Sequence, residues 1–293
     1  MYTITKQHLS HEGAEYDQYV LADTEAGTTV TVTPCKGGMI TGMTLAGQEF
    51  SWLRDPNFYL PERPRCAVPV LFPCCGRCAD GKNTFEGKEY PMDIHGMAHS
   101  LPWNVVAEDC TDGAALTVEL TDSEATREFY PYAFSARITY RLKGSTVTLE
   151  QAYHNADSKP MPFAFGFHPY FACTDVRNLQ WDLKAATQED PDTGASIPAP
   201  AQVDFPYDPD QTTRYYKGVQ SPMAFTDTGS GHKVTVSFDE HFGNVVLWSQ
   251  CELGFVCMEP WNGWPNSLNT PDHEVLNPGE TLNAQCAFTM ELA

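Results

Sequence analysis

The sequence predicts an all-β protein whose strands form a large antiparallel sandwich. Runs of alternating apolar and polar residues recur along most of the chain, with Gly, Asp and Asn turns between them. Signals for helices are sparse by comparison. A Gly-rich phosphate loop and a strand–helix–strand rhythm are both missing from the sequence, which argues against a nucleotide-binding α/β fold.

The alternating runs are expected to be strands because successive side chains of a strand point to opposite faces of a sheet. Between two of the runs, Lys143, Gly144 and Ser145 have turn character, so residues 134–150 predict a hairpin. The predicted strands are residues 28–33, 115–120, 134–142, 146–150, 233–238, 244–248 and 284–292.

Only one segment carries a helix-start signal. Thr121 and Glu124 have the spacing of a capping box, and a short turn over 125–128 would end before Pro131. Residues 190–210 are rich in Pro and Asp. Strand patterns continue on both sides of this stretch, so we expect a long surface loop bordering a cleft rather than a linker. We therefore treat residues 1–293 as one domain.

Composition and charge restrict the class of protein. Hydrophobic residues make up 42% of the 293 residues, enough for a sizeable core. No stretch approaches the roughly 20 apolar residues of a membrane span, and the start of the chain lacks a signal-peptide pattern. We expect a soluble, cytoplasmic protein. The net charge of −20 argues against nucleic acid and anionic membranes as partners and favours a neutral small-molecule substrate. The oligomeric state is left open.

Ten cysteines are scattered through the chain, and in a large chain without a signal peptide they are expected to be reduced thiols. Three of them, Cys74, Cys75 and Cys78, form a cluster with one CxxC spacing. One interpretation is a metal or redox site, and the other is small thiols that fill the end of a strand. A second CxxC pair to complete a zinc site is missing, which favours the second interpretation.

Four segments combine titratable or polar side chains with Gly, Pro or Trp, which set unusual backbone geometry or offer flat apolar surface. They are residues 72–77 with Arg77, residues 93–103 with His95 and His99, residues 163–171 with His168, and residues 257–264 with Glu259 and Trp261.

His168 lies in the aromatic stretch FAFGFHPYF. A histidine with its ordinary pKa of about 6.5 gives and takes protons near neutral pH. In a strand, Phe165, Phe167 and Phe171 would share one face, and His168 and Tyr170 the other. That second face suits a ligand site. The alternative is a core histidine bonded to a backbone carbonyl.

Glu259 ends an apolar run and precedes Trp261, whose flat ring can pack against the C–H groups of a sugar. A carboxylate at the end of a buried strand is costly without partners or a function. The alternative is a surface glutamate at a turn. His95 and His99 are four residues apart, but Gly96 weakens the helix that would bring them to one metal ion. We therefore expect His95 to bind substrate.

Taken in order, these motifs resemble the aldose 1-epimerase (galactose mutarotase-like) family, and most of all its LacX-type branch. The resemblance covers nearly the whole chain. Its motifs are GGMI (37–40), FPCCGR (72–77), GKNTFEGKEY (81–90), HGMAH (95–99) with Trp103, DSEATREFYPYAF (122–134), MPFAFGFHPYF (161–171), MEPWNGWPNSLN (258–269) and NPGE (277–280).

The resemblance implies a β-supersandwich whose concave face holds a sugar, with His168 as general acid and Glu259 as general base. It also implies that Arg77 and His95 contact the oxygens of the sugar. Two positions depart from common family patterns: His99 stands where many relatives have Arg, and Gly76 precedes Arg77, as in the LacX-type branch. These departures leave the acid–base pair intact and concern the choice of substrate.

The expected reaction is exchange of the α and β anomers of a hexose through ring opening, by acid–base catalysis. We expect no metal, nucleotide or other cofactor. A glycoside hydrolase is the weaker alternative because only Glu259 has a convincing setting, whereas hydrolases use two carboxylates. A binding protein without turnover and an epimerase of a phosphorylated or sulfonated sugar are further alternatives. The last would require additional basic residues, and Arg77 alone lies near the motifs.

Overall fold

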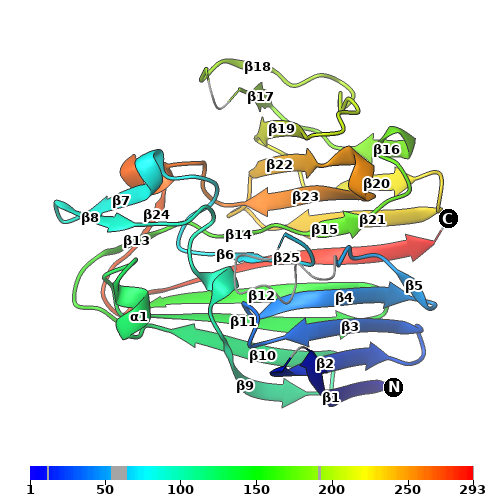
Figure 1. The fold of residues 1–293 in the computed structure, drawn as a ribbon, viewed down its shortest axis with the longest axis horizontal. Coiled ribbons are helices and arrows are strands. Elements are labelled where there is room, and N and C mark those ends of the chain that lie inside the picture. The colour runs from blue at the N-terminus through cyan, green and yellow to red at the C-terminus, as the bar shows by residue number, and fades with distance from the viewer. Residues whose placement is uncertain (12, 54–64, 191–192, 293) are drawn as a thin grey trace.

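The computed structural model describes residues 1–11, 13–53, 65–190 and 193–292 (Figure 1). Strands make up most of the regular structure of these residues, and their one α-helix is α1 (Glu124–Arg127). All paired strands of the described sheets run antiparallel. The predicted all-β antiparallel fold is confirmed.

The central layer is an eight-stranded sheet in the order β16-β20-β21-β25-β12-β11-β10-β9. It contains the long predicted hairpin. Its strands are β9 (Asn104–Asp109), β10 (Ala114–Thr121), β11 (Phe134–Lys143), β12 (Thr146–Asn155), β16 (Leu179–Asp182), β20 (Met223–Asp227), β21 (His232–Phe238) and β25 (Thr281–Leu292).

The N-terminal part of the chain forms a five-stranded sheet in sequence order. Its strands are β1 (Tyr2–His11), β2 (Ala14–Asp23), β3 (Thr28–Thr33), β4 (Met39–Leu45) and β5 (Gln48–Glu49). Strands β1 and β2 contact β10, and β4 contacts β25, so this sheet lies against the central one (Figure 1).

The third sheet has the order β18-β17-β19-β22-β23-β14-β6, with β15 also paired to β23. Its inner face packs on the central sheet. For example, the ring of Phe171 lies 5.8 Å from that of Phe225 and 5.7 Å from that of Phe288. Its strands are β6 (Val70–Leu71), β14 (Gly166–Phe167), β15 (Tyr170–Ala172), β17 (Thr187–Glu189), β18 (Ser196–Pro198), β19 (Thr212–Lys217), β22 (Asn244–Ser249) and β23 (Phe255–Trp261).

Smaller elements complete the fold. Two-stranded sheets are formed by β7 (Lys82–Phe85) with β8 (Lys88–Pro91) and by β13 (Met161–Phe163) with β24 (Glu274–Leu276). The 3-10 helices are η1 (Ala79–Gly81), η2 (Ala98–Ser100), η3 (Val176–Asn178), η4 (Cys251–Leu253) and η5 (Ser267–Asn269).

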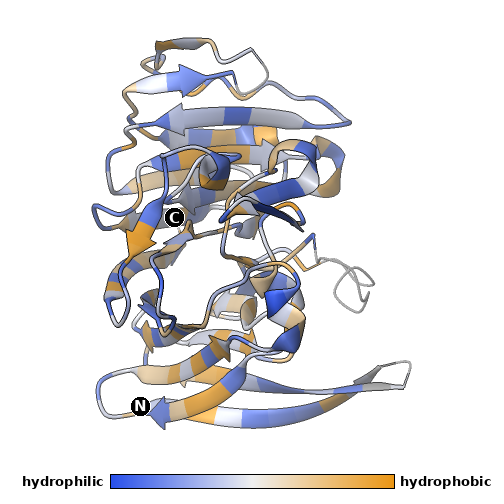
Figure 2. Ribbon diagram, turned by 90° about the vertical axis from the view of Figure 1, so that its left-hand side faces the viewer, coloured by the Kyte–Doolittle hydropathy of each residue, from blue (hydrophilic) through white to orange (hydrophobic). Residues whose placement is uncertain are grey.

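The alternation of apolar and polar residues in the sequence corresponds to an alternation of buried and more exposed side chains along the strands. Every second residue of β11 is buried, and β11 pairs with β12 from Phe134 opposite Asn155 to Lys143 opposite Thr146. Figure 2 shows hydrophobic and hydrophilic residues alternating along several strands. Strand β23 is buried at all seven positions because it lies in the middle of its sheet, with one face on the core and the other beneath side chains such as Tyr170 and Trp248.

Two local predictions need correction. The helix cap is Ser123 rather than Thr121, which is the last residue of β10. Ser123 Oγ accepts a hydrogen bond from the backbone N–H of Thr126, and Thr126 Oγ1 accepts one from Ser123 N–H. The stretch 190–210 is predicted to be a long surface loop bordering a cleft; Asp190 does line a cavity, but the stretch also contains β18, which pairs with β17 at the sheet edge. Residues 191–192 of this stretch lie outside the described residues.

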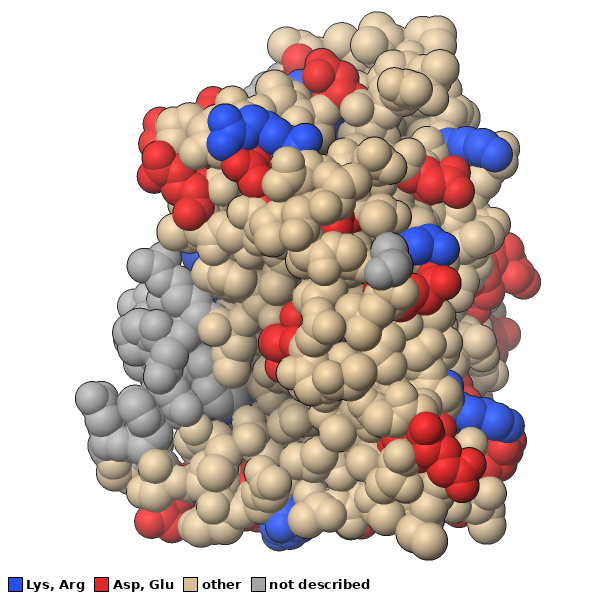
Figure 3. Space-filling model, turned by 90° about the vertical axis from the view of Figure 1, so that its right-hand side faces the viewer, with Lys and Arg blue, Asp and Glu red and all other residues tan. Residues whose placement is uncertain are grey.

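The charged surface offers no single binding patch on the side drawn in Figure 3, where acidic side chains are scattered among neutral ones. None of the helices in the described residues has both the length and the apolar character needed to cross a membrane.

Candidate active site

The four segments singled out in the sequence meet at the edge of the third sheet. Backbone hydrogen bonds tie them together: His168 N–H donates to Pro69 O over 3.0 Å, and Met97 N–H donates to Phe72 O over 2.9 Å. The fourth segment joins through Gly166, which pairs with Trp261 across β14 and β23. A glycine is required there, since a Cβ atom would lie 2.8 Å from the carbonyl oxygen of Pro260.

These segments border a cavity of about 1000 Å³. This volume is at the upper end of the range of small-molecule sites, roughly 300–1,000 Å³, so a monosaccharide with a substituent can be accommodated. The lining contains Gly76, Arg77, His95, His168, Tyr170, Glu259, Trp261 and Trp264 from the predicted segments, together with Arg65, Gln188, Glu189, Asp190, Arg214, Tyr215 and Trp248 from elsewhere.

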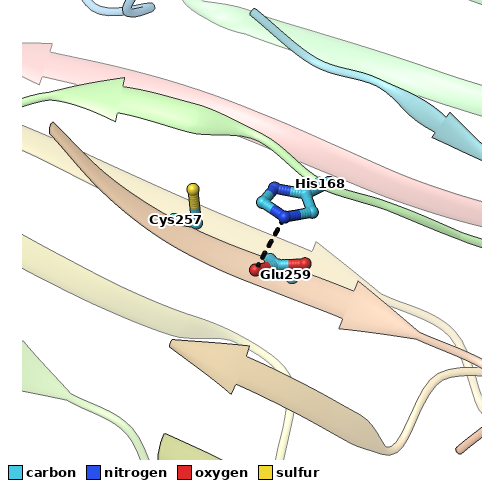
Figure 4. Close-up of side chains that lie close together, drawn as sticks. All are labelled: His168, Cys257 and Glu259. Carbon is cyan, nitrogen blue, oxygen red and sulfur yellow. Dashed lines mark ion pairs between the residues drawn. The ribbon is translucent and has the colours of Figure 1, made fainter. Parts of the chain in front are cut away.

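His168 and Glu259 face each other in this cavity (Figure 4). The Nε2 atom of His168 lies 3.4 Å from the Oε1 atom of Glu259. His168 is 9% exposed and Glu259 is 1% exposed. Two protonatable groups are therefore adjacent in a site that is largely screened from bulk water, where the electrostatic interaction between them is strengthened.

The aromatic residues around His168 divide between two faces, as expected from the strand period. Phe167 and Phe171 join the main core. On the other face, the ring of Tyr170 stacks on that of His168 with centroids 4.7 Å apart, and Trp248 approaches its edge at 5.9 Å. The core face anchors the segment, and the stacked Tyr170 ring orients the imidazole toward the cavity.

His95 is held by two reciprocal backbone contacts with Gly76. The N–H of Gly76 donates to His95 Nδ1 over 3.0 Å, and the N–H of His95 donates to Gly76 O over 2.8 Å. Because Nδ1 accepts a hydrogen bond, a neutral His95 ring carries its proton on Nε2. The ring lies edge-on to His168 and to Trp261, with centroids 5.1 and 5.5 Å apart. His95 thus presents a defined tautomer to the cavity.

The backbone geometry at position 76 explains why the residue before Arg77 is a glycine. Its φ is +69°, and an added Cβ would lie 2.9 Å from the side chain of Pro265. Arg77 follows as an exposed side chain on the cavity wall. Trp261 is 2% exposed and lies beside both Leu71 and Cys75 on the floor of the site.

His99, unlike His95, does not line the cavity. It lies in η2, is 1% exposed, and is not among the residues that line the cavity. Its backbone lies so close to Gly37 that a Cβ there would be 2.3 Å from the His99 carbonyl oxygen. The departure at position 99 therefore lies behind the site rather than in its lining.

Sequence reasoning missed several lining residues. Arg214, Tyr215 and Trp248 come from β19 and β22, two strands whose sequences look like ordinary sheet. Arg65 precedes β6. Trp248 reaches the cavity because Val246 pairs with Glu259, so alternate residues of β22 flank the same face, and this register is visible only in the structure.

The contacts within the cysteine cluster do not follow the CxxC spacing of Cys75 and Cys78. Cys78 Sγ lies 3.7 Å from Cys74 Sγ in a thiol hydrogen bond, whereas Cys75 packs against Trp261 and Val246. Burial raises the pKa of the Cys75 thiol, and the hydrogen bond with Cys74 lowers the pKa of Cys78. All ten cysteines are free thiols. This packing agrees with the interpretation of thiols that fill the interior.

In the described ranges, the residues that could together bind a metal ion are neither this cysteine cluster nor His95 and His99. Among the residues that the structure describes, the cluster of His, Cys and carboxylate ligand atoms within 4.8 Å of one another is His168, Cys257 and Glu259. His95 and His99 are not part of it.

A sequence model of the aldose 1-epimerase family matches residues 17–289. The chain belongs to the aldose 1-epimerase family. Aldose 1-epimerases are isomerases that act on small sugars, so the resemblance seen in the sequence and the enzyme class are confirmed.

Protein LacX of Lactococcus lactis subsp. lactis is 24% identical to this aldose 1-epimerase family member over 260 residues, covering 79% of this chain and 84% of LacX. An Escherichia coli K12 protein provisionally named a glucose-6-phosphate 1-epimerase is 27% identical over 188 residues, covering 63% of this chain and 58% of that protein. The crystal structure of Slr1438 from Synechocystis sp. PCC 6803 superposes with a TM-score of 0.91 at 29% identity, covering 97% and 99% of the two chains.

Proposed function

We propose that the protein interconverts the α and β anomers of a hexose by general acid–base catalysis, with His168 as acid and Glu259 as base. One observation carries the proposal: His168 Nε2 and Glu259 Oε1 lie 3.4 Å apart at the cavity wall. The hydroxyl oxygen O1 and the ring oxygen O5 of a pyranose are both bonded to C1. An acid and a base that lie side by side can therefore reach both oxygens of one sugar.

In the proposed reaction, Glu259 takes the proton of the O1 hydroxyl while protonated His168 gives a proton to O5. The C1–O5 bond breaks and C1 becomes an aldehyde. After rotation about the C1–C2 bond, O5 attacks the other face of C1. His168 takes back the O5 proton and Glu259 returns its proton to O1. Both side chains end as they began, which is the requirement for a catalyst.

The other lining residues have binding roles in this proposal. His95 donates a hydrogen bond from Nε2 to a sugar hydroxyl, and Arg77 donates to another oxygen. Trp261 provides a flat apolar surface for the C–H groups of the sugar. These roles agree with the positions of all three residues in the cavity lining.

Polarimetry tests the proposal directly. Freshly dissolved α-glucose or α-galactose should reach its equilibrium rotation faster with the protein than without it, in the presence of a chelator. Glu252, an exposed glutamate of η4, offers a matched control for Glu259. Full activity of folded Glu259→Gln, or loss of activity in Glu252→Gln, would contradict the assigned role.

A second candidate substrate is a hexose that carries an anionic group. The sequence suggested a neutral sugar because Arg77 was the one basic residue near the motifs, but Arg65 and Arg214 line the same cavity. Arginine is suited to bidentate binding of phosphate, sulfonate and carboxylate. The lining also carries Glu189 and Asp190, and Glu189 pairs with Tyr215, the residue after Arg214, so these carboxylates would oppose an anion bound at Arg214.

A comparison of kcat/KM for a phosphorylated and a neutral hexose distinguishes the two candidate substrates. We would measure kcat/KM for glucose 6-phosphate and for glucose by exchange NMR, in the wild type and in Arg65→Met and Arg214→Met. If the phosphate is recognised, each variant loses roughly ten- to a hundredfold for glucose 6-phosphate and little for glucose, as expected for hydrogen bonds to a charged group. Equal losses on both sugars would leave the neutral hexose as the substrate.

A further inference from the structure

Cys257 lies next to the proposed acid–base pair, although the reaction has no use for a thiol. Cys257 and Glu259 are two residues apart on β23 and so point to the same face of the strand. His168 faces them from the connection between β14 and β15 (Figure 4). The ligand atoms of the three side chains lie within 4.8 Å of one another.

These separations are close to those of a tetrahedral metal site. Zinc bonds of about 2.0 Å to nitrogen or oxygen and 2.3 Å to sulfur place neighbouring ligand atoms roughly 3.3–3.8 Å apart. The 3.4 Å between His168 Nε2 and Glu259 Oε1 already falls in this range. The other separations are at most 4.8 Å, so reaching the roughly 3.5 Å between a sulfur and a nitrogen or oxygen ligand needs a shift of about 1.3 Å at most, shared among the side chains by χ1 adjustments.

The donor set selects the class of metal ion. An imidazole, a thiolate and a carboxylate are ligands for borderline ions such as Zn²⁺ and Co²⁺, whereas Mg²⁺ and Ca²⁺ prefer oxygen alone. A thiolate and a carboxylate together also neutralise the two positive charges of the ion, which matters because all three side chains are buried.

Two features of the site concern how an ion would enter and where the proton of the Cys257 thiol would go. His168 and Glu259 line the cavity, so an ion can enter from there and keep a water molecule as its fourth ligand. Cys257 is fully buried among Tyr170 and Phe255, and burial, together with the charge of Glu259, raises the pKa of its thiol. Binding must therefore displace the thiol proton into the cavity.

We propose that His168, Cys257 and Glu259 form a zinc site whose occupation blocks the acid–base pair. The ion would hold His168 Nε2 and the Glu259 carboxylate, the atoms that exchange protons with the sugar, so that zinc and sugar exclude each other. The inhibitory consequence rests on the proposed function, whereas the binding of the ion does not.

Cobalt binding tests the site without relying on activity. The full chain is titrated with Co²⁺, whose bond to a thiolate gives a charge-transfer absorption, and Zn²⁺ is then added to displace it. We expect one cobalt ion per chain with thiolate absorption. Cys257→Ala should lose this absorption and weaken zinc binding by more than about a hundredfold, since even outer-shell substitutions cost 10–100-fold.

Cys78→Ala is the matched control because Cys78 is also a buried thiol near the cavity, but outside the trio. It should keep the cobalt signal. Unchanged zinc affinity in folded Cys257→Ala, or no stoichiometric cobalt–thiolate absorption in the wild type, would overturn the proposed site.

Inhibition is measured separately by polarimetry. Zinc should slow the wild type, a chelator should restore it, and Cys257→Ala should turn over normally while resisting zinc. If the protein has no mutarotase activity on any sugar tested, the cobalt titration still decides the metal site. If activity is present and zinc binds at the trio without slowing it, the blocking role is wrong although the site exists.

Discussion

His168 Nε2 lies 3.4 Å from Glu259 Oε1, and the two residues come from different strand segments that pair through β14 and β23. His168 is held by the connection between β14 and β15 and Glu259 by β23, so either can be replaced without removing the other. We expect His168→Gln and Glu259→Gln each to lower kcat by about 10²–10⁴, the range of positioned acid–base catalysis.

The double variant should be hardly slower than the single ones, because the two groups act in one proton exchange and their effects are not additive. Polarimetry measures the rates, and circular dichroism checks the fold. Losses that multiply in the double variant would mean that the two residues act independently.

Because His95 Nδ1 accepts a hydrogen bond from Gly76 N–H, the Nε2–H group of the ring is the donor available to a sugar, and its removal should weaken binding. His95→Asn keeps the left-handed backbone at φ +69°, which asparagine tolerates, but removes the ring donor. The loss of one neutral hydrogen bond should lower kcat/KM by roughly two- to tenfold, mainly through KM. Initial rates over a range of sugar concentrations separate the two terms. A fall in kcat alone would place His95 in the proton transfer instead.

Gly96 should be irreplaceable for a steric reason. Its φ is +82°, and an added Cβ would lie 2.2 Å from the carbonyl oxygen of Phe72. Because that contact is backbone against backbone, Gly96→Ala should destabilise the protein by more than about 4 kcal/mol and displace the segment that carries Arg77.

Gly47→Ala is the control for that substitution. Gly47 has a similar φ of +77° but nothing within 4 Å of an added Cβ. It should cost only the left-handed strain of about 1–2 kcal/mol. Urea unfolding of both variants measures the difference, and equal costs would show that the contact with Phe72 relaxes.

Asp227 should stabilise the fold in a pH-dependent way. Burial alone would raise its pKa, but hydrogen bonds from the backbone N–H and hydroxyl of Thr174, from Gly229 N–H and from the Ser230 hydroxyl lower the pKa below its usual value of 3.8. The stabilisation is thus complete above about pH 4 and is lost as the pH falls through the lower pKa of the folded state.

We expect Asp227→Asn to reduce the free energy of unfolding by about 2–3 kcal/mol at pH 7, the size of a hydrogen bond to a charged group. The difference from the wild type should shrink below pH 4. Exposed Asp272 offers the control: Asp272→Asn should change stability by less than about 0.5 kcal/mol. A gap that persists undiminished at pH 3 would show that the charge is not involved.

Local patterning determined the strands. The run 28–33 is β3, and the predicted hairpin over 134–150 is β11 and β12 with longer ends. The helix was placed correctly to within a residue or two, but its cap was not, because Thr121 extends β10 and the hydroxyl of Ser123 is the first one free of the sheet. A capping motif beside a strand end cannot be resolved by spacing alone.

The sequence by itself determined the strand pattern, the family and the segments in which His168, Glu259, His95, Arg77 and Trp261 lie, since each of these is marked by residues close to it in the chain. Only the tertiary structure decided which distant side chains share their cavity. Arg65, Arg214 and Trp248 arrive there through strand order and register, and Cys257 meets His168 only because β15 pairs with β23. Strand pairing depends on contacts between segments far apart in the chain, and no local pattern encodes them.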